Sequence, residues 1–430
     1  MSAVSPAGSD PVATAGGLRR QLGVFDAVMI GLGSMIGAGI FAALAPAAQA
    51  AGSALLLGLA VAAVIAYCNA TSSARLAAVY PTSGGTYVYG REQLGQFWGY
   101  LAGWGFVAGK TASCAAMALT VGSYAWPAHA HSVAVAAVVA LTAVNYAGVQ
   151  KSAWLTRLIV AVVLAVLAAV VITALGADGI VVARLDVTAG SAGGVLQAAG
   201  LLFFAFAGYA RIATLGEEVR DPARTIPKAI PIALAITLAV YALVAIGALT
   251  VLGPQQLSNA SAPLLDTVTA AGAPWLQPVV GAGAVVAAVG SLLALILGVS
   301  RTTFAMARDR HLPHLLAAVH PKSGVPHRAE LLIGAVVAVL AATTDIRGAI
   351  GFSSFAVLIY YAIANASAWT LRPDQGRPPR IVPITGLLGC IVIAFALPLP
   401  SILSGAAVLA VGAAVYGIRQ LRRTPRPTST

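Results

Sequence analysis

Charged side chains are scarce in this sequence, and their scarcity excludes an ordinary soluble domain. Of the 430 residues, 9% are charged and 59% are hydrophobic, with a mean hydropathy of +0.89, whereas about a quarter of a typical soluble domain is charged. Cysteine is also rare, and Cys68, Cys114 and Cys390 all lie in apolar stretches. We therefore expect neither a disulfide framework nor a zinc site. The composition predicts an integral membrane protein.

Catalytic side chains are missing from the apolar stretches. The six histidines all lie in predicted loops, at His129, His131, His311, His314, His320 and His327. A membrane-embedded enzyme would need clustered His, Asp or Cys side chains inside the spans, so we expect no enzymatic activity, no cofactor and no metal. The net charge of +12 would suit a nucleic acid partner in a soluble protein, but its placement beside membrane spans excludes that partner.

Long apolar segments are abundant. About twelve stretches approach or exceed the ~20 residues that a helix needs to cross a bilayer. They lie at 24–45, 51–70, 97–124, 132–149, 155–175, 194–216, 229–252, 279–304, 331–344, 348–370, 382–397 and 400–418. The short alternating segments of a β-barrel are lacking. The sequence therefore predicts an all-α polytopic membrane protein with about twelve transmembrane helices.

The basic residues lie mostly on one side of these segments. If the N-terminus is cytoplasmic, all Lys and Arg residues except Lys110, Arg184, Arg211 and Arg347 fall on the cytoplasmic side. By the positive-inside rule, this predicts an even number of spans with both ends cytoplasmic, in the inner (plasma) membrane of the cell. Residues 1–17 lack the basic start and apolar core of a signal peptide. We expect a disordered cytoplasmic tail there and a basic cytoplasmic tail over 419–430.

Glycine gathers in the first apolar segment, at Gly31, Gly33, Gly37 and Gly39. Each costs a helix about 1 kcal/mol relative to alanine, so the stretch is a poor continuous helix. A second glycine-interrupted segment, FFAFAGYARIATLGEEV, runs from Phe203 to Val219. Matching interruptions in two halves are typical of transporters built from inverted repeats. They predict a five-plus-five helix core over 18–370, followed by two further helices over 371–418.

Four motifs carry a resemblance to a known family. They are GSMIGAGIF in the first segment, YPTSGGTYVY from Tyr80, FFAFAGY followed by EEVRDPARTIPKAI, and SRTTFAMARDRHLP followed by HPKSGVPHRA. With these motifs in this order, the chain resembles the amino acid/polyamine/organocation transporter superfamily, and in particular a bacterial amino acid permease. The resemblance implies a LeuT-like 5+5 inverted repeat plus two C-terminal helices, and transport by alternating access.

The first interrupted segment is the predicted substrate site. We expect its substrate-binding residues to be Ser34, Met35, Ile36, Gly37, Ala38 and Gly39. In hydrocarbon, unpaired backbone groups occur only where they line a cavity or meet a partner. A break here would direct N–H groups of the outer half-helix at a carboxylate and leave carbonyls near 30–33 for an ammonium. The alternative is that Gly33 and Gly37 form a close helix-packing face.

The second interrupted segment supplies the other half of the predicted site. Its predicted substrate-binding residues are Phe204, Ala205, Phe206 and Gly208. The resemblance implies a second helix break here and an aromatic lid over the substrate at Phe204. Plain aromatic packing in the core is the alternative for Phe204, and more so for Phe206.

Arg211 lies on the same segment, and a charge in a membrane helix marks function by default. Glu217 and Glu218 follow about two helical turns later, within reach of the arginine. An inner-gate ion pair and a substrate contact are equally supported. Several relatives in the resembled family carry an acid at the position of Ala210, where it meets basic substrates. Its absence argues against a cationic substrate side chain.

Lys110 is the predicted proton-coupling residue. It lies near the middle of the third apolar segment, and burial disfavours the charged form of a lysine. In the resembled family, proton-coupled members often carry a lysine on helix five in place of a bound sodium ion, but residues 158–171 contain none. We expect Lys110 to serve instead, with the proton preferred to sodium. The alternative is a permanently charged lysine that holds a carboxylate or a gate carbonyl.

The sequence therefore predicts a secondary active transporter in the lipid bilayer that takes up a neutral or small amino acid with a proton. The alternatives are an amino acid exchanger and a transporter of cationic amino acids or polyamines. A channel is disfavoured, because a closed site between two broken helices occludes its ligand, whereas conduction needs weak binding along an open pore.

Overall fold

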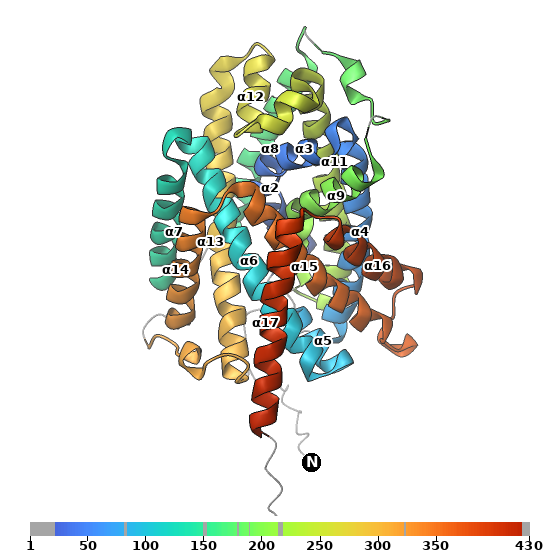
Figure 1. Ribbon diagram of the computed structural model, residues 1–430, viewed down its shortest axis with the longest axis vertical. Coiled ribbons are helices and arrows are strands. Elements are labelled where there is room, and N and C mark those ends of the chain that lie inside the picture. Colours follow the sequence, from blue (N-terminus) through green and yellow to red (C-terminus); the bar gives the residue numbers. More distant parts are fainter. Residues whose placement is uncertain are drawn as a thin grey trace, which may run out of the picture.

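The computed structural model describes residues 22–80, 84–148, 153–178, 180–188, 190–213, 218–321 and 324–423. These residues form helices and no β-strand, and their one isolated bridge pairs Leu22 with Val219. Figure 1 shows a bundle that is elongated along one axis, with α12 towards one end and the end of α17 at the other. The described part of the chain is therefore all-α, as predicted.

The helices fall into two halves of the chain. The first half holds α1 (Val24–Met35), α2 (Ala38–Ala42), α3 (Leu44–Ala51), α4 (Leu55–Val79), α5 (Thr86–Leu94), α6 (Gln96–Ala125), α7 (Ala130–Tyr146), α8 (Ala153–Leu175), α9 (Ala192–Phe206) and α10 (Ala210–Ala213). The second half holds α11 (Pro222–Asn259), α12 (Pro263–Ala270), α13 (Gln277–Arg308), α14 (His327–Thr343), α15 (Ile346–Trp369), α16 (Ile381–Phe395) and α17 (Leu399–Arg423). Short 3-10 turns, among them η4 (Ala207–Tyr209) and η6 (His314–Ala317), join some of them.

Nine segments of the described chain are long and apolar enough to cross a membrane. They are Val24–Ala42, Leu44–Val79, Pro127–Tyr146, Trp154–Leu175, Ala192–Ile212, Pro222–Asn259, Pro274–Arg308, Ile346–Trp369 and Leu399–Leu421. The remaining predicted spans correspond to α6, α14 and α16. The chain is thus an all-α polytopic membrane protein, as predicted, and the count of twelve spans stays a prediction.

Several helices extend beyond the apolar stretches that predicted them. α11 begins at Pro222 rather than at 229, because a proline at the first helical position needs no partner for a backbone N–H. α13 continues past 304 to Arg308. α14 begins at His327 rather than at 331, so that Glu330 lies in a helix and is fully buried. A span predicted from hydropathy ends at the first charged residue, whereas the helix itself continues as long as its backbone hydrogen bonds form.

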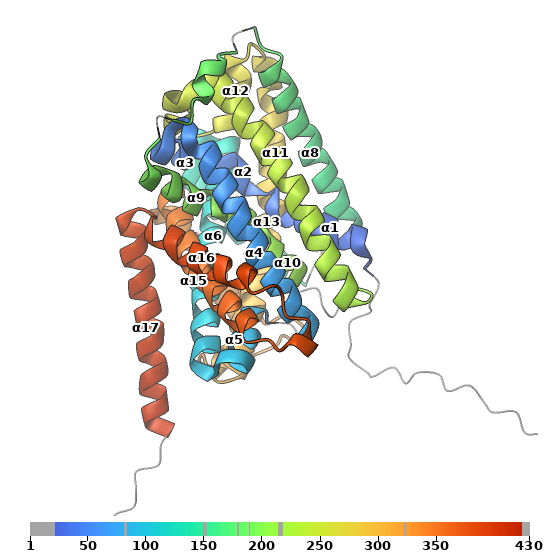
Figure 2. The same cartoon turned by 90° about the vertical axis from the view of Figure 1, so that its right-hand side faces the viewer.

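The long helices pack around a shared core, with α6 against α13 and α15, and α4 against α9 and α11. Figure 2 shows α17 at one side of the bundle and α1, α8 and α11 towards the other, with α16 running across the near face. This arrangement is consistent with two helices added to a ten-helix core. The division into a core over 18–370 and added helices over 371–418 stays a prediction.

Candidate functional site

The first apolar segment is broken where its glycines predicted a break. α1 ends at Met35 and α2 begins at Ala38, with Ile36 and Gly37 in non-helical conformations between them. The N–H of Ile36 still donates to the carbonyl of Leu32, at 2.6 Å. The first half of the interrupted helix, α1, therefore ends at Met35, later than the carbonyls at 30–33 that the sequence suggested, because the last turn stays hydrogen-bonded.

Two carbonyls at the end of α1 accept hydrogen bonds from side chains of other helices. Tyr241 Oη, on α11, donates to the carbonyl of Met35 at 2.5 Å. Ser291 Oγ, on α13, lies 3.3 Å from the carbonyl of Gly33 and 2.9 Å from that of Ala287. The break therefore meets the rule that backbone groups inside a membrane need a partner.

The second interrupted segment changes its helical geometry at the predicted place. α9 ends at Phe206, η4 covers Ala207–Tyr209, and α10 follows from Ala210. The carbonyl of Ala207 accepts from Tyr361 Oη at 3.3 Å and from Lys110 Nζ at 3.5 Å. The buried Lys110 thus contacts a carbonyl at the second break, which is one of the two roles that the sequence left open for it.

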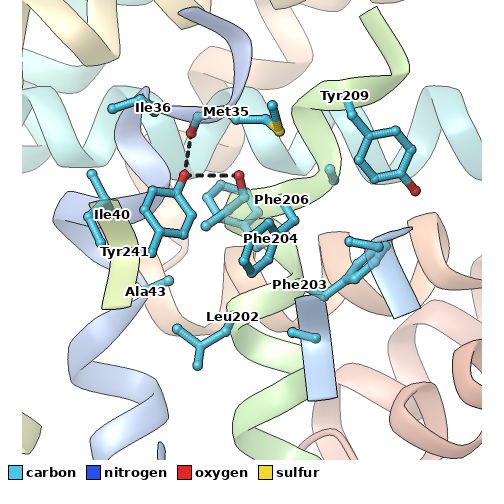
Figure 3. Packing of buried hydrophobic residues seen from close by; sticks show 14 of the residues in the cluster. Met35, Ile36, Ile40, Ala43, Leu202, Phe203, Phe204, Phe206, Tyr209 and Tyr241 are labelled. Carbon is cyan, nitrogen blue, oxygen red and sulfur yellow. Dashed lines mark hydrogen bonds between the residues drawn. The ribbon is translucent and has the colours of Figure 1, made fainter. Parts of the chain in front are cut away.

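The two breaks lie against each other. Tyr241 Oη donates both to the carbonyl of Met35 and, at 3.1 Å, to that of Ala205 (Figure 3). A Cβ atom on Gly39 would lie 2.6 Å from Ala205 Cα, and one on Gly208 would overlap the carbonyl of Ser34. These glycines are required because the two backbones touch.

The third glycine at the breaks, Gly37, has a side chain beside it. A Cβ there would overlap Ser291 Oγ and lie 2.8 Å from Ser291 Cβ. In this conformation, protein atoms therefore occupy the space beside Gly37, Gly39 and Gly208. Close helix packing, which the sequence offered as the alternative for Gly33 and Gly37, accounts for Gly37 in this conformation, and the same kind of contact is found at Gly39 and Gly208.

Aromatic side chains cover the breaks. Phe206 is fully buried, and its ring packs against that of Tyr241 with centroids 5.2 Å apart. Phe204 is 8% exposed and lies beside Phe206 and Tyr241 in Figure 3. Phe203 packs edge-on against Tyr361. Phe206 is thus a core residue, while the predicted lid role of Phe204 stays a prediction.

Ion pairs join the helices at the end where α1 begins. Arg211 Nη2 lies 3.3 Å from Glu218 Oε1, and both side chains are about one-third exposed. Arg157 on α8 pairs with Asp26 on α1. The predicted gate partner Glu217 lies outside the described residues. Arg211 thus forms the ion pair with Glu218 that the sequence allowed, while its role as gate or substrate contact stays a prediction.

Sequence reasoning missed the hydroxyl groups that tie the breaks together. Tyr241, Ser291 and Tyr361 lie on α11, α13 and α15, far from the breaks in the chain. A hydroxyl inside an apolar span needs a partner, so each could have been noticed as a candidate. Its partner could not have been named, because that depends on how the helices pack.

A cavity of about 790 Å³ lies on the α12 side of the breaks. Its lining includes the charged side chains Asp345 and Arg347 near the start of α15, together with Phe41 of α2 and Leu201 of α9. Phe41 and Leu201 lie within about two helical turns of the breaks along their own helices. Among the described residues, no group of three His, Cys, Asp or Glu side chains could hold a metal ion.

Interrupted helices in contact within an all-helical membrane protein are a feature of secondary transporters that are built on discontinuous helices. The chain belongs to the amino acid permease family, whose sequence profile matches residues 22–416. This confirms the family that its motifs resemble.

Curated relatives support the same class. The chain is 75% identical over 405 residues to an uncharacterized transporter of Mycobacterium tuberculosis, covering 94% of this chain and 92% of that protein. It is 26% identical over 437 residues to the branched-chain amino acid permease BcaP of Bacillus subtilis, covering 93% and 92%. It is 29% identical over 394 residues to cationic amino acid transporter 4 of Homo sapiens, covering 84% and 61%. The family and these names indicate a transporter rather than an enzyme.

Proposed function

We propose that the protein is a secondary active transporter that takes up a neutral or small amino acid together with a proton. The observation that carries the proposal is the contact between the two breaks, where Tyr241 bridges Met35 and Ala205 and Lys110 reaches Ala207. Two interrupted helices joined by a few side chains can separate and close again as rigid pieces, which is what alternating access requires.

Substrate binding follows from the polarity of the first break. Once the breaks separate, N–H groups of Gly37, Ala38 and Gly39 at the start of α2 are available to a carboxylate. The carbonyls of Gly33 and Met35, held here by Ser291 and Tyr241, become available to an ammonium. An α-amino acid carries both groups on one carbon. We expect it to replace the side-chain donors that close the site in this conformation.

The surroundings of the breaks favour a neutral substrate side chain. Within the described chain, the side chains that hydrogen-bond to the breaks are hydroxyls and one lysine, and none is a carboxylate. Phe204 and Phe206 add apolar surface. The name of the Bacillus relative specifies branched-chain amino acids, and that of the human relative specifies cationic ones. The lysine and the absence of an acid support the first of these classes.

Lys110 is the proposed coupling residue. It is 7% exposed, and the carbonyl of Ala207 is its hydrogen-bond acceptor. A neutral amine and an ammonium can both donate to that carbonyl, so the contact can persist in both protonation states. Movement of η4 would alter the exposure of the amine to water and hence its charge. The alternative is that Lys110 is permanently charged and only holds the carbonyl of Ala207. In that case, accumulation of the substrate does not depend on the proton gradient.

The proposal includes an orientation in the membrane. The distribution of Lys and Arg residues supports cytoplasmic N- and C-termini and insertion in the plasma membrane. The ion pairs of Arg211 with Glu218 and of Arg157 with Asp26 would then lie on the cytoplasmic side and the 790 Å³ cavity on the outer side. The described conformation would be closed inside and accessible from outside.

Uptake by purified protein in liposomes tests this function. Labelled leucine, alanine, lysine and putrescine are added with and without an acid-outside pH gradient, in sodium-free buffer, with protein-free liposomes as the control. We expect leucine or alanine to accumulate only with the gradient, and lysine and putrescine to compete poorly. Absence of uptake for every amino acid, or uptake that depends on sodium at fixed pH, contradicts the proposal.

A further inference from the structure

A buried carboxylate lies away from the breaks, in the first turn of α14. Glu330 is 0% exposed, and neither of its carboxylate oxygens has a hydrogen-bond partner within the described residues. Burying an ionised carboxylate without donors costs several kcal/mol, and such a group takes up a proton instead. The environment of Glu330 therefore needs an explanation.

The polar groups that face Glu330 are already engaged elsewhere. Ser300 on α13 and Asn145 on α7 face the carboxyl group. Ser300 Oγ donates to the carbonyl of Ile296 at 2.8 Å, and Asn145 Nδ2 donates to that of Leu293 at 3.2 Å. Ser300 Oγ thus uses its one hydrogen on backbone, whereas Asn145 Nδ2 keeps a second hydrogen, and a hydrogen bond from either side chain to Glu330 would favour the carboxylate. With the other hydrogens engaged by backbone, a carboxylate at this buried position has too few donors for its two unpaired oxygens, so a protonated carboxyl group is favoured.

Charged and titratable groups approach Glu330 from the helices packed around α14. Arg301 on α13 lies within electrostatic range of Glu330, and also of Arg211 and Glu218. Cys114 on α6 lies within electrostatic range of both Glu330 and Lys110.

Other titratable groups lie near both ends of this helix, and at its end His131 Nδ1 lies 2.8 Å from the carbonyl of Ala341. α7 brings Tyr146 against His327, with ring centroids 6.4 Å apart, and η6, which packs on α14, carries His314. Arg301 thus connects Glu330 electrostatically with the Arg211–Glu218 ion pair, and Cys114 connects it with Lys110.

We propose that Glu330 is a proton-binding site that carries a proton in the conformation described here. This role rests on the transport function proposed above. The carboxylate of Glu330 takes up a proton from water in one state of the transport cycle and releases it to water in another. When the Arg211–Glu218 ion pair separates, the positive charge of Arg301 stabilises the ionised form of Glu330. Glu330 is then a second titrating group, beside Lys110, in proton-coupled transport.

Infrared spectroscopy of the purified protein tests the protonation directly and needs no substrate. A protonated carboxylic acid has a C=O stretching band that a carboxylate lacks. We expect wild-type protein at pH 7 to show such a band, Glu330→Gln to lack it, and Glu92→Gln, which changes an exposed acid, to keep it. If Glu330→Gln does not fold, Glu330→Asp should shift the band. A spectrum unchanged by the Glu330 substitutions overturns the proposal.

Transport by the same variants tests the coupling role. Glu330→Gln mimics the protonated state, so it should lose accumulation driven by a pH gradient, retain exchange of labelled for unlabelled substrate, and show exchange that no longer varies with pH. Glu330→Asp should restore accumulation. Accumulation by Glu330→Gln at the wild-type level, with the wild-type pH profile, refutes the coupling role. If wild-type protein transports no amino acid, the proposed function fails, while the infrared result still decides whether Glu330 is protonated.

Discussion

Substitution of Gly37 by alanine tests the contact at the first break. A Cβ at this position would overlap Ser291 Oγ and lie 2.8 Å from Ser291 Cβ, whereas carbon atoms in contact prefer about 3.5–4.0 Å. Either Ser291 or the break must shift by several tenths of an ångström. Such overpacking costs about 1–3 kcal/mol. Since 1.4 kcal/mol corresponds to a factor of ten, we expect exchange of the transported amino acid to slow by roughly ten- to a hundredfold.

A second substitution should relieve the clash. Ser291→Gly removes both atoms that the new methyl group meets, so the double variant Gly37→Ala/Ser291→Gly should regain most of the exchange rate. The coupling energy between the two positions should be about 0.5–3 kcal/mol, as for other residues in contact. Ser291→Gly alone should slow exchange little, because its bond to the carbonyl of Gly33 is long, at 3.3 Å, and its other acceptor, the carbonyl of Ala287, lies inside α13 and keeps its helical backbone partner.

The assay is exchange in liposomes, with thermal unfolding of the purified protein as a measure of folding. Gly298→Ala is the control, because Gly298 lies on α13, the helix that carries Ser291, and a Cβ there would meet no atom within 4 Å. Wild-type exchange by Gly37→Ala would refute the reasoning. So would failure of Ser291→Gly to rescue it, because the clash would then lie elsewhere.

Further substitutions test the other contacts of the site. Tyr241→Phe removes the donor to two backbone carbonyls and should destabilise the protein by about 1–3 kcal/mol in thermal unfolding, whereas Tyr67→Phe, on a half-exposed side chain, should have no effect. Lys110→Ala should lose accumulation driven by a pH gradient but keep exchange, and accumulation at the wild-type level would show that its role is structural. Glu218→Gln breaks a partly exposed ion pair with Arg211, so it should change stability by less than about 1 kcal/mol while raising the rate of substrate leakage; unchanged leakage would remove the gate role.

Local features of the sequence predicted the breaks. Glycines in an apolar run mark a weak helix, and the interruptions lie at Ile36–Gly37 and Ala207–Tyr209, inside the segments named from the sequence. The charges of Lys110 and Arg211 also indicate helices that lie at the second break, because a charge in an apolar run stands out whatever it contacts.

Contacts between distant segments could not be predicted in this way. Nothing near Lys110 in the chain specifies that it meets the carbonyl of Ala207, and nothing near Tyr241 specifies that it bridges two breaks. Glu330 lies just outside the span predicted at 331–344, because a span predicted from hydropathy stops at a charged residue, whereas α14 begins at His327 and buries Glu330. Which residues contact each other, and which residues are buried, depends on how the helices pack, and a residue pattern along one chain does not show this.

The central claim is that an amino acid binds between the two breaks, and a structure of the protein with the amino acid that it transports tests this most directly. The account predicts the substrate carboxylate within hydrogen-bonding distance of the N–H groups of Gly37, Ala38 or Gly39, and its ammonium beside the carbonyl of Gly33 or Met35. A substrate bound only in the outer cavity beside Asp345 and Arg347, with Tyr241 still bridging the two breaks, would contradict it.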